Sequence, residues 1–499
     1  MITTLTNRLQ RLSPLWTAVV VGALFTLWSI AQNPVLNDDA YQYLRAAQMV
    51  SHGDITGMYA EYGWFHYSVL IAALDKVLPG DELLAARALN LLLQALLIGV
   101  FVALAQHLHS GRRAGWLAAL TLLAYPQLNE LRFALIRDFG FWAFALWSLR
   151  LLLQYRDSHR FVHALGWLLT LLAATAFRLE ALVLAAIAPL ALLGRELRHR
   201  GLVLYALLLA TALFVAAACA ALHIDLLGRM QFAYRYYLPQ LFALPSQLQA
   251  QAHALLQQLF TADNLPGNDN VTLGLFILLF GYGASLVSTL VPALSVPLSV
   301  FLLHALWRRW WRPLAGWRSP VGIYAIGTTA SLIVFVVLMH FLTERYTMLL
   351  CLLILLQVPA ILGRWIDHAK AQTSNLRYRV IAGFFVVYFF TDSLISFGPG
   401  LQHLVQARDW LRQHPDQGDG FVTTEPFLAY ESKRIARYDN VRQPLPQVLA
   451  GLQSGNLFAV VVQASDSQDR ALLEHDQRLV PVERFANKRG DEVRIYKVQ

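Results

Sequence analysis

The stretch that decides the fold is "PLWTAVVVGALFTLWSIAQNPVLNDDAYQYL", residues 14 to 44. It begins with a long apolar run, and two adjacent carboxylates, Asp38 and Asp39, follow soon after that run ends. An apolar run of this length can cross a hydrocarbon layer of about 30 Å. No small-residue cleavage site follows the run, so we predict a retained signal anchor. Carboxylates beside a membrane segment are costly unless they face water or take part in function.

The composition of the whole chain is that of a membrane protein. Of its 499 residues, 57% are hydrophobic and 14% are charged, and the mean hydropathy is +0.46. A soluble globular protein is far less apolar than this. The sequence predicts a polytopic α-helical membrane protein with about eleven transmembrane helices. The apolar runs lie at about 15–31, 90–108, 115–128, 133–154, 161–177, 180–194, 201–222, 271–306, 319–341, 346–363 and 380–397.

One of these runs, 271–306, is too long for a single straight span. It contains Gly281, Gly283, Pro292 and Pro297, which weaken a continuous helix. Two interpretations stay open: a broken span, or a span followed by an interfacial helix.

The positions of Lys and Arg in the short loops predict the orientation, because cytoplasmic loops are rich in these residues. Basic residues precede the first span and then fall in alternate loops: Arg8, Arg11, Arg112, Arg113, Arg156, Arg160, Arg195, Arg198, Arg200, Arg308, Arg309, Arg312, Arg318, Arg364, Lys370, Arg377 and Arg379. We therefore predict a multi-pass protein of the inner (plasma) membrane with a cytoplasmic N-terminus. The segments 32–89 and 223–270 and the tail then lie on the outer side.

The tail differs from the rest of the chain. From 400 to 499, 13 Lys and Arg stand against 13 Asp and Glu, so the net charge of +9 comes from the membrane part and indicates topology, not nucleic-acid binding. Alternation predicts strands in "GFVTTE", "LFAVVVQA" and "EVRIYKV", with helices in "LPQVLAGLQSG" and "DRALLEH". The expected organisation is a transmembrane domain, 1–398, and a small α/β extracytoplasmic domain, 399–499. Amphipathic helices are expected at 62–78 and 244–260, within the outer loops.

Charged residues outside the basic loops gather on the predicted outer side. They are Glu130, Arg132, Arg137, Asp138, Arg178, Glu180, Glu344 and Arg345. A lone ion near hydrocarbon costs several kcal/mol, so these groups are expected to pair or to line a wet cavity. Together with Asp38 and Asp39 they predict one outer vestibule, meaning a water-facing space at the outer ends of the spans.

Each of these features also has a purely structural interpretation. Asp38 or Asp39 could cap the helix predicted by "DAYQYLRAAQMV", since Asp is a favoured cap. The pairs Arg178/Glu180 and Glu344/Arg345 could be ion pairs at helix ends. His66, within "GWFHYS", could be an interfacial histidine. The functional interpretation rests on the occurrence of all these groups on one side.

Such a vestibule suits sugar transfer from an anionic lipid carrier. Arg is geometrically suited to a polyprenyl phosphate leaving group. A carboxylate on the opposite side can deprotonate an acceptor hydroxyl as it attacks the sugar carbon. By analogy with inverting glycosidases, this geometry predicts inversion.

The order of five segments also resembles a known family. "DDAYQYLRAAQMVSHGDI", "RALNLLLQALLIGVFVALAQHL", "IRDFGFWAFALW", "AFRLEALVL" and "ERYTMLLCLLILL" together resemble the GT-C superfamily of membrane glycosyltransferases. Within it, they resemble the branch that contains the protein O-mannosyltransferases and the aminoarabinose transferases.

The resemblance implies a donor sugar linked to polyprenyl phosphate, an outer-face reaction and specific roles. Asp38 is implied as the catalytic base, with Asp39 beside it. Asp138, with Glu130 nearby, is implied as the second acidic site. Arg345 and Tyr346 are implied at the donor phosphate, where Arg137 and Arg178 are further candidates. His66, Glu180 and Glu344 are additional site candidates. The acceptor could be a glycolipid, a surface glycan or a protein hydroxyl.

Three questions stay open at this level. Metal use is one, because Asp38, Asp39, Asp138, Glu130 and His66 offer ligands for a divalent cation without requiring one. The second is a surface-polysaccharide polymerase or ligase, which would depend on Arg229 in the loop 223–270. The third is a transporter or flippase of a lipid-linked anion. That class is disfavoured by the lack of a visible repeat and by charges at the outer face instead of the midplane.

Overall fold

The computed structural model describes most of the chain. The described residues are 12–78, 81–194, 196–221, 238–259, 271–311, 316, 318–371, 380, 383–384, 387–391, 401–414, 421–431, 445–450, 459–464, 467–488 and 490–498. Contacts divide the chain into two compact units. The first, here the helical unit, comprises 1–22, 93–128 and 137–387, and the second, here the mixed unit, comprises 23–92, 129–136 and 388–499.

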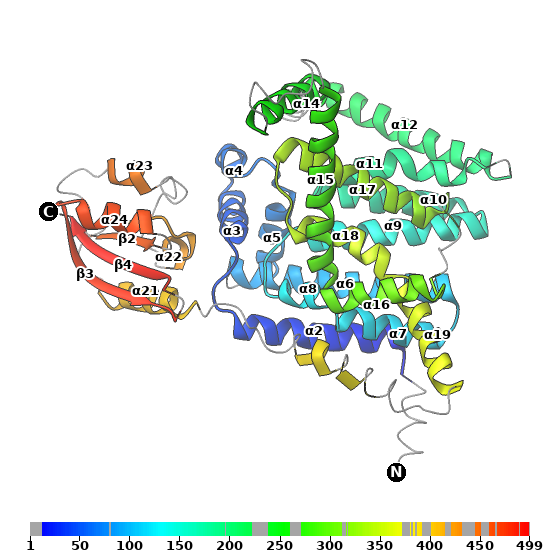
Figure 1. Ribbon diagram of the computed structural model, residues 1–499, viewed down its shortest axis with the longest axis horizontal. Coiled ribbons are helices and arrows are strands. Elements are labelled where there is room, and N and C mark those ends of the chain that lie inside the picture. Colours follow the sequence, from blue (N-terminus) through cyan, green and yellow to red (C-terminus); the bar gives the residue numbers. More distant parts are fainter. Residues whose placement is uncertain are drawn as a thin grey trace, which may run out of the picture. The chain divides into compact units, whose positions relative to one another are not determined.

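The helical unit is built from apolar helices joined by short connections. In Figure 1, α9, α10, α11 and α17 lie side by side, and each packs on at least two of the others. The helices of this unit, with parts of α2 (Pro14–Gln32) and α6 (Glu82–His109), are α7 (Arg112–Leu123), α9 (Asp138–Ser158), α10 (Phe161–Phe177), α11 (Glu180–Ile187) with the 3-10 turn η1 (Ala188–Leu192), α12 (Arg198–Ala221), α14 (Leu238–Leu259), α15 (Val271–Leu294), α16 (Val296–Trp307), α17 (Pro320–Met339), α18 (Glu344–Leu355) and α19 (Val358–Ala371).

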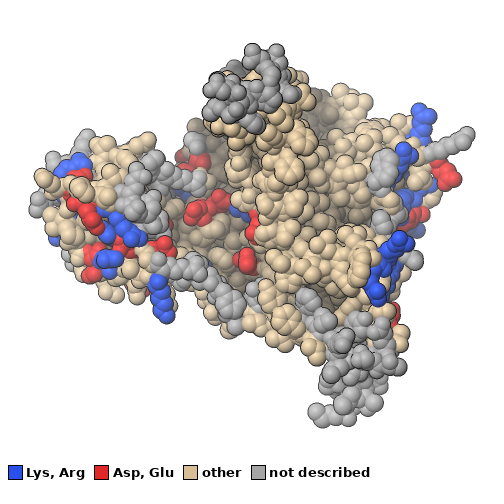
Figure 2. Space-filling model, viewed as in Figure 1, with Lys and Arg blue, Asp and Glu red and all other residues tan. Residues whose placement is uncertain are grey.

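Large apolar side chains are exposed along several of these helices. Trp16 on α2 is 68% exposed, Phe214 on α12 is 72% exposed and Phe276 on α15 is 68% exposed. Figure 2 shows one group of charged side chains at the right-hand edge of the view, near the end of α9 and the beginnings of α10 and α12 in Figure 1. Contiguous exposed apolar surface of this kind suits lipid contact. The chain is a polytopic helical membrane protein.

The structure supports fewer full-length spans than the eleven that the apolar runs predict. Among the described residues, five helices are long and apolar enough to cross a membrane, or six if α18 and α19, bent by 47°, count as one. The predicted spans at 115–128, 161–177 and 180–194 fall on helices of 12, 17 and 8 residues. At 1.5 Å per residue these are shorter than a hydrocarbon core of about 30 Å. The count of eleven therefore stays a prediction.

The run at 271–306 is divided in two, as both interpretations require. α15 ends at Leu294 and α16 begins at Val296, with Ser295 between them at a φ of 68°. A positive φ is uncommon for a residue with a Cβ and interrupts the helix. The break therefore lies between the two prolines Pro292 and Pro297.

The segment 32–89, which the sequence predicts as an outer loop, is helical over much of its length. It contains α3 (Asp38–Ser51), α4 (Ile55–Glu61) and α5 (His66–Asp75), and α3 packs on both others. α8 (Pro126–Glu130) leads into the segment 131–136. The sequence predicts helices at 62–78 and 244–260. α5 lies within the first range, and α14 covers nearly all of the second.

Two asparagines hold the segment 131–136 in place. The Asn37 side chain accepts a hydrogen bond from Leu135 N at 2.9 Å and donates one to Leu135 O at 3.3 Å. The buried Asn90 side chain donates to Ala134 O at 2.9 Å. Backbone groups that lack a helix or sheet partner are thereby satisfied.

The tail contains a four-stranded sheet of order β1-β2-β4-β3, made by β1 (Phe421–Thr423), β2 (Ala459–Ala464), β3 (Leu479–Ala486) and β4 (Glu492–Val498). β1 and β2 are parallel, and the other pairs are antiparallel. The helices are α21 (Gln402–Gln413), α22 (Pro426–Glu431), α23 (Leu445–Ala450) and α24 (Ser467–His475). The three predicted strands and two predicted helices are present, whereas β3, α21 and α22 were not predicted.

A single carboxylate organises three arginines at the sheet. The Glu492 side chain is fully buried. It pairs with Arg494 at 2.6 Å, with Arg470 at 3.3 Å and with Arg484. A buried carboxylate needs such partners, because burying it unpaired is costly.

Candidate functional site

Four helix ends of the helical unit bring charged side chains together. Asp138, Glu180 and Glu344 are the first residues of α9, α11 and α18, and Arg178 follows the last residue of α10. Carboxylates in a first helical turn and a cation after a last turn are favoured by the helix dipole. Of these side chains, Asp138, Glu180 and Arg178 meet at one end of the bundle.

Arg178 is the centre of this cluster. Its guanidinium donates to Asp138 Oδ1 through NH1 and to Glu180 Oε1 through Nε, the latter at 3.0 Å. Its NH2 also pairs with Glu180 Oε1. The Arg178 side chain is 8% exposed and that of Asp138 is 1% exposed. Each nitrogen of this guanidinium is thus engaged by a carboxylate, which is the arrangement that makes burial of the charges tolerable.

Arg345 joins the cluster from α18. Its Nε lies 3.6 Å from Asp138 Oδ2, and its side chain is 26% exposed, more than that of Arg178. The Tyr346 ring lies beneath both guanidiniums: the Arg178 Cζ atom is 4.6 Å and the Arg345 Cζ atom 5.6 Å from its centroid. Cations at this distance are attracted by the face of the ring. Tyr346 therefore helps to hold two like charges close together.

A small cavity adjoins the cluster. It has room of about 30 Å³ for water, enough for about two molecules. Arg178, Glu180 and Tyr346 line its polar side, and Phe335 and Leu332 of α17 line its apolar side. The Phe335 and Tyr346 rings are 4.5 Å apart. The cluster thus has both a polar and an apolar boundary.

Close packing of α9 on α10 sets the distance between Asp138 and Arg178. A Cβ added at Gly140 would lie 2.4 Å from Cε1 of Phe177. The absence of a side chain at Gly140 therefore lets α10 approach α9 beside the cluster.

The Asp38/Asp39 pair lies in the mixed unit at the start of α3. Asn37 occupies the N-cap position without a side-chain cap hydrogen bond, since its amide binds Leu135. Asp38 and Asp39 are in the first turn, where carboxylates favour the helix dipole. Asp38 is exposed and Asp39 is half-buried. Neither aspartate occupies the N-cap position, so the capping interpretation does not account for the pair.

The charge of Asp38 acts on a carboxylate of the tail, Glu425. α22 packs on α3, and the rings of Tyr41 and Tyr430 are 5.7 Å apart. Glu425, which immediately precedes α22, is half-buried. Burial and, to a smaller extent, the negative charge of Asp38 together raise the pKa of the Glu425 carboxyl to about 7. Burial also raises the pKa of Tyr41, with further contributions from Glu431, Asp38 and Glu425, although Leu36 N donates to its hydroxyl at 3.3 Å.

Sequence reasoning did not single out Glu425, Tyr41 or Tyr430. Glu425 stands in "TTEPFLAYE", where an acid before a proline resembles any helix start. Its relation to Asp38 depends on packing between segments at opposite ends of the chain, which no local pattern encodes.

The remaining predicted site residues are placed as follows. His66 begins α5, and its ring stacks on that of Phe65 at 4.6 Å and lies 5.3 Å from that of Trp64. The interpretation of His66 as an interfacial histidine expects aromatic neighbours of this kind. Glu130 is exposed at the end of α8, and Arg137 and Glu344 are half-buried. Arg229 lies outside the described residues.

Among the described residues, no group of three or more His, Cys, Asp and Glu side chains is arranged to hold a metal ion. Where the side chains are described, the acids are instead engaged by arginines, as at Asp138 and Glu180.

Comparison with known proteins shows the fold. No known family profile and no curated protein sequence matches this chain. Among solved structures, the chain is similar to ArnT from Cupriavidus metallidurans bound to undecaprenyl phosphate, with a TM-score of 0.53 and 14% sequence identity over 96% of this chain and 97% of that one. The likeness spans both the transmembrane part and the tail. The chain has a fold like that of ArnT.

Proposed function

We propose that this protein is an inverting glycosyltransferase. It moves a sugar from a polyprenyl-phosphate-linked donor to an envelope acceptor on the outer face of the inner (plasma) membrane. The single observation that carries the proposal is the Asp138–Arg178–Arg345 cluster at the helix ends, backed by the Tyr346 ring. Support comes from the likeness to a structure that contains undecaprenyl phosphate.

Within the cluster, Arg345 is the better candidate for the donor phosphate. Every nitrogen of Arg178 is already engaged by Asp138 or Glu180, whereas Arg345 is more exposed and its contact with Asp138 is longer. A guanidinium can bind two phosphate oxygens at once. Asp138, Glu180 and Arg178 are then positioning residues, which hold Arg345 and Tyr346 in place.

Asp38 is the proposed base. Its carboxylate is exposed at the start of α3 and can accept the proton of an acceptor hydroxyl. The acceptor oxygen attacks the anomeric carbon from the face opposite the phosphate, and the carbon–oxygen bond to phosphate breaks. Its electron pair leaves with the polyprenyl phosphate, whose charge Arg345 stabilises. The configuration at the sugar carbon is inverted, and the proton stays on Asp38.

The test is mass spectrometry of envelope glycans, glycolipids and glycoproteins from a deletion strain. The strain is complemented with the wild type, Asp38→Asn, Arg345→Gln or the control Asp81→Asn, all at matched membrane levels. General-base catalysis contributes about 10²–10⁴-fold, so Asp38→Asn should abolish a sugar modification that the wild type restores. Arg345→Gln should lower it, and Asp81→Asn, on an exposed aspartate before α6, should restore it fully.

Two results would contradict the proposal. If Asp38→Asn restored the product to the wild-type level, Asp38 would not be the base. If no sugar differed between the deletion and wild-type strains while a lipid-linked intermediate accumulated, a flippase would explain the fold better.

A further inference from the structure

A cavity in the described part of the helical unit lies at the opposite end of α9 from Asp138. It has a volume of about 340 Å³, within the range of small-ligand pockets of about 300–1,000 Å³. Five segments line it: the end of α6, the end of α9, Trp310 after α16, the start of α17, and the segment from Gln357 into α19. By the loop-charge pattern this end faces the cytoplasm.

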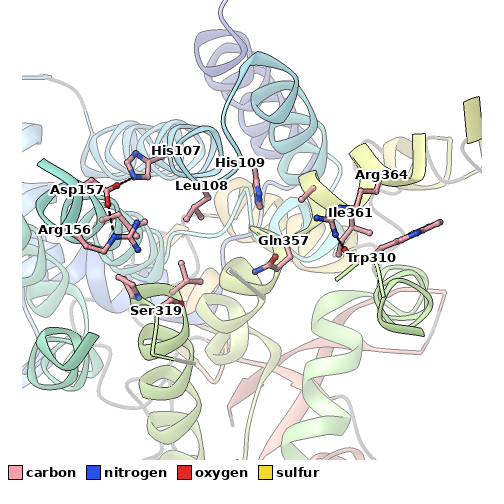
Figure 3. A pocket seen from close by; sticks show the side chains of 14 residues that line it. His107, Leu108, His109, Arg156, Asp157, Trp310, Ser319, Gln357, Ile361 and Arg364 are labelled. Atoms are coloured by element: carbon pink, nitrogen blue, oxygen red, sulfur yellow. Dashed lines mark hydrogen bonds and ion pairs between the residues drawn. The ribbon is translucent and has the colours of Figure 1, made fainter. Parts of the chain in front are cut away.

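The lining carries more positive than negative charge. Arg156 and Arg364 contribute two guanidiniums on opposite sides of the cavity, as Figure 3 shows, and the one carboxylate in the lining is Asp157. That carboxylate is already engaged, by Arg156 Nε at 2.8 Å and by His107 Nε2 at 3.1 Å. Arg364 donates to the Trp310 carbonyl. The Arg364 side chain itself lines the cavity, and its guanidinium has further N–H groups besides the one that binds Trp310.

The positive lining favours an anion, and the start of α17 favours it as well. α17 begins beside Ser319, which caps it by accepting from Gly322 N at 3.1 Å, and Pro320 and Val321 line the cavity. Pro320 has no N–H and Gly322 N is bound by Ser319, so the start of α17 contributes the positive end of its dipole and the N–H of Val321. Gln357 and His109 add polar side chains between the two arginines in Figure 3, and His109 Nε2 donates to Leu356 O at 2.6 Å.

The surroundings of the cavity suit an amphiphile better than a free anion. Leu153, Val321 and Ile361 give it an apolar wall. Trp310 packs against His304 of α16, with ring centroids 5.7 Å apart. Trp307 and Leu303 of α16 are 77% and 64% exposed. An apolar, exposed helix face beside a basic pocket provides a path for acyl chains that leave the headgroup site.

We propose that this cavity binds the phosphate group of an anionic phospholipid of the surrounding membrane. The phosphate lies between Arg156 and Arg364 near the start of α17, and the acyl chains follow α16. The inference is independent of the transferase reaction, because it concerns the other end of the bundle.

The test measures lipid binding to the purified full-length protein in detergent by native mass spectrometry. Phosphatidylglycerol, phosphatidylethanolamine and glycerol 3-phosphate are the three probes. The variants are Arg364→Gln, which removes one cation, and Ala360→Phe, which fills the cavity without changing charge. Arg160→Gln is the matched control, because Arg160 is exposed before α10 and does not line the cavity.

The wild type and Arg160→Gln should bind phosphatidylglycerol in preference to phosphatidylethanolamine. Loss of one charged hydrogen bond corresponds to about a tenfold or larger loss of affinity, so Arg364→Gln and Ala360→Phe should each weaken phosphatidylglycerol binding by at least that factor. If Arg364→Gln does not fold, Ala360→Phe carries the test.

Three outcomes would overturn the proposal. Equal binding of the two phospholipids would remove the role of charge. Phosphatidylglycerol binding that neither cavity variant weakens would place the lipid elsewhere. Binding of glycerol 3-phosphate that the same variants weaken, without a preference for phosphatidylglycerol, would make this a site for a soluble phosphate and not for a lipid.

Discussion

Arg345 Nε lies 3.6 Å from Asp138 Oδ2, which joins the first turn of α18 to the first turn of α9. Asp138 also pairs with Arg178, so one buried carboxylate holds guanidiniums that come from two other parts of the chain. The positions of Arg345 and Tyr346 therefore depend on a residue that need not touch the substrate.

Asp138→Asn should destabilise the protein by about 3–5 kcal/mol, because it leaves the buried Arg178 with one carboxylate fewer. Thermal unfolding of the purified protein in detergent measures this. The control is Asp409→Asn, since Asp409 pairs with Arg408 at 2.8 Å but is 49% exposed, and exposed pairs contribute little. Equal unfolding temperatures for the two variants would show that the Asp138 cluster does not stabilise the fold.

Gly140→Ala should disturb the cluster without changing any charge. Its Cβ would lie 2.4 Å from the Phe177 ring, so α10, and with it Arg178, must move relative to α9. We expect at least about a tenfold loss of transfer activity, since small displacements of positioning groups are costly.

Gly166→Ala is the matched control for Gly140→Ala in the same helix pair. Its Cβ would meet Leu151 Cδ1, the end of a flexible side chain, at 3.3 Å. It should keep near wild-type activity. Transfer assays on membranes with matched protein levels compare the two, and an active Gly140→Ala enzyme would contradict the close-packing argument.

Glu425 should make stability depend on pH. Its pKa is raised from an ordinary value of 4.5 to about 7, so the folded protein holds this proton more tightly than the unfolded chain. The stabilisation is full below pH 4.5 and is lost as pH rises to about 7. The groups that act electrostatically around this contact are Asp38, Tyr41 and Glu431.

Glu425→Gln should remove this pH dependence, because Gln resembles the protonated carboxyl. Unfolding temperatures of the full-length protein between about pH 5 and pH 8 test this. Glu483→Gln, on an exposed residue of β3, should retain the wild-type dependence. Parallel profiles for wild type and Glu425→Gln would count against the charge interaction between Glu425 and Asp38.

Glu492→Gln should destabilise the tail by about 3–5 kcal/mol, because three arginines would lose their shared buried carboxylate. Hydrogen exchange of β3 and β4 in the full-length protein reports on this region. Glu474→Gln removes a second partner of the same Arg494, but Glu474 is 60% exposed, so exchange should barely change. Comparable exchange in both variants would refute the role of Glu492.

The sequence predicts much of this architecture because apolar length and alternation are local properties. The helical membrane class, the break within 271–306 and three of the four tail strands follow from such patterns. β3 was missed because "LVPVERFA" contains a proline and a charged pair, which hide its alternation. The number of full spans could not be obtained, because a run of apolar residues does not show where a helix ends.

The candidate site could be predicted in part. Charges on the same side of successive spans predict that Asp138, Arg178, Glu180 and Arg345 lie close together, and the structure brings them together. Arg178 has a carboxylate partner at every guanidinium nitrogen, whereas Arg345 is more exposed. This difference depends on how the helices pack, which the sequence does not specify. The same holds for Glu425, whose contact with the α3 region exists only after the tail has folded.

The two asparagine side chains that hold 131–136 have a consequence for how this segment can vary. Asn37 binds both backbone groups of Leu135, and Asn90 binds the carbonyl of Ala134, so two consecutive residues are fixed from two different helices. A single inserted or deleted residue would place different backbone groups opposite these two side-chain amides, and the hydrogen bonds would be lost. This irregular segment should therefore tolerate changes in side chains but not in length, which is the reverse of what is usual for a surface connection.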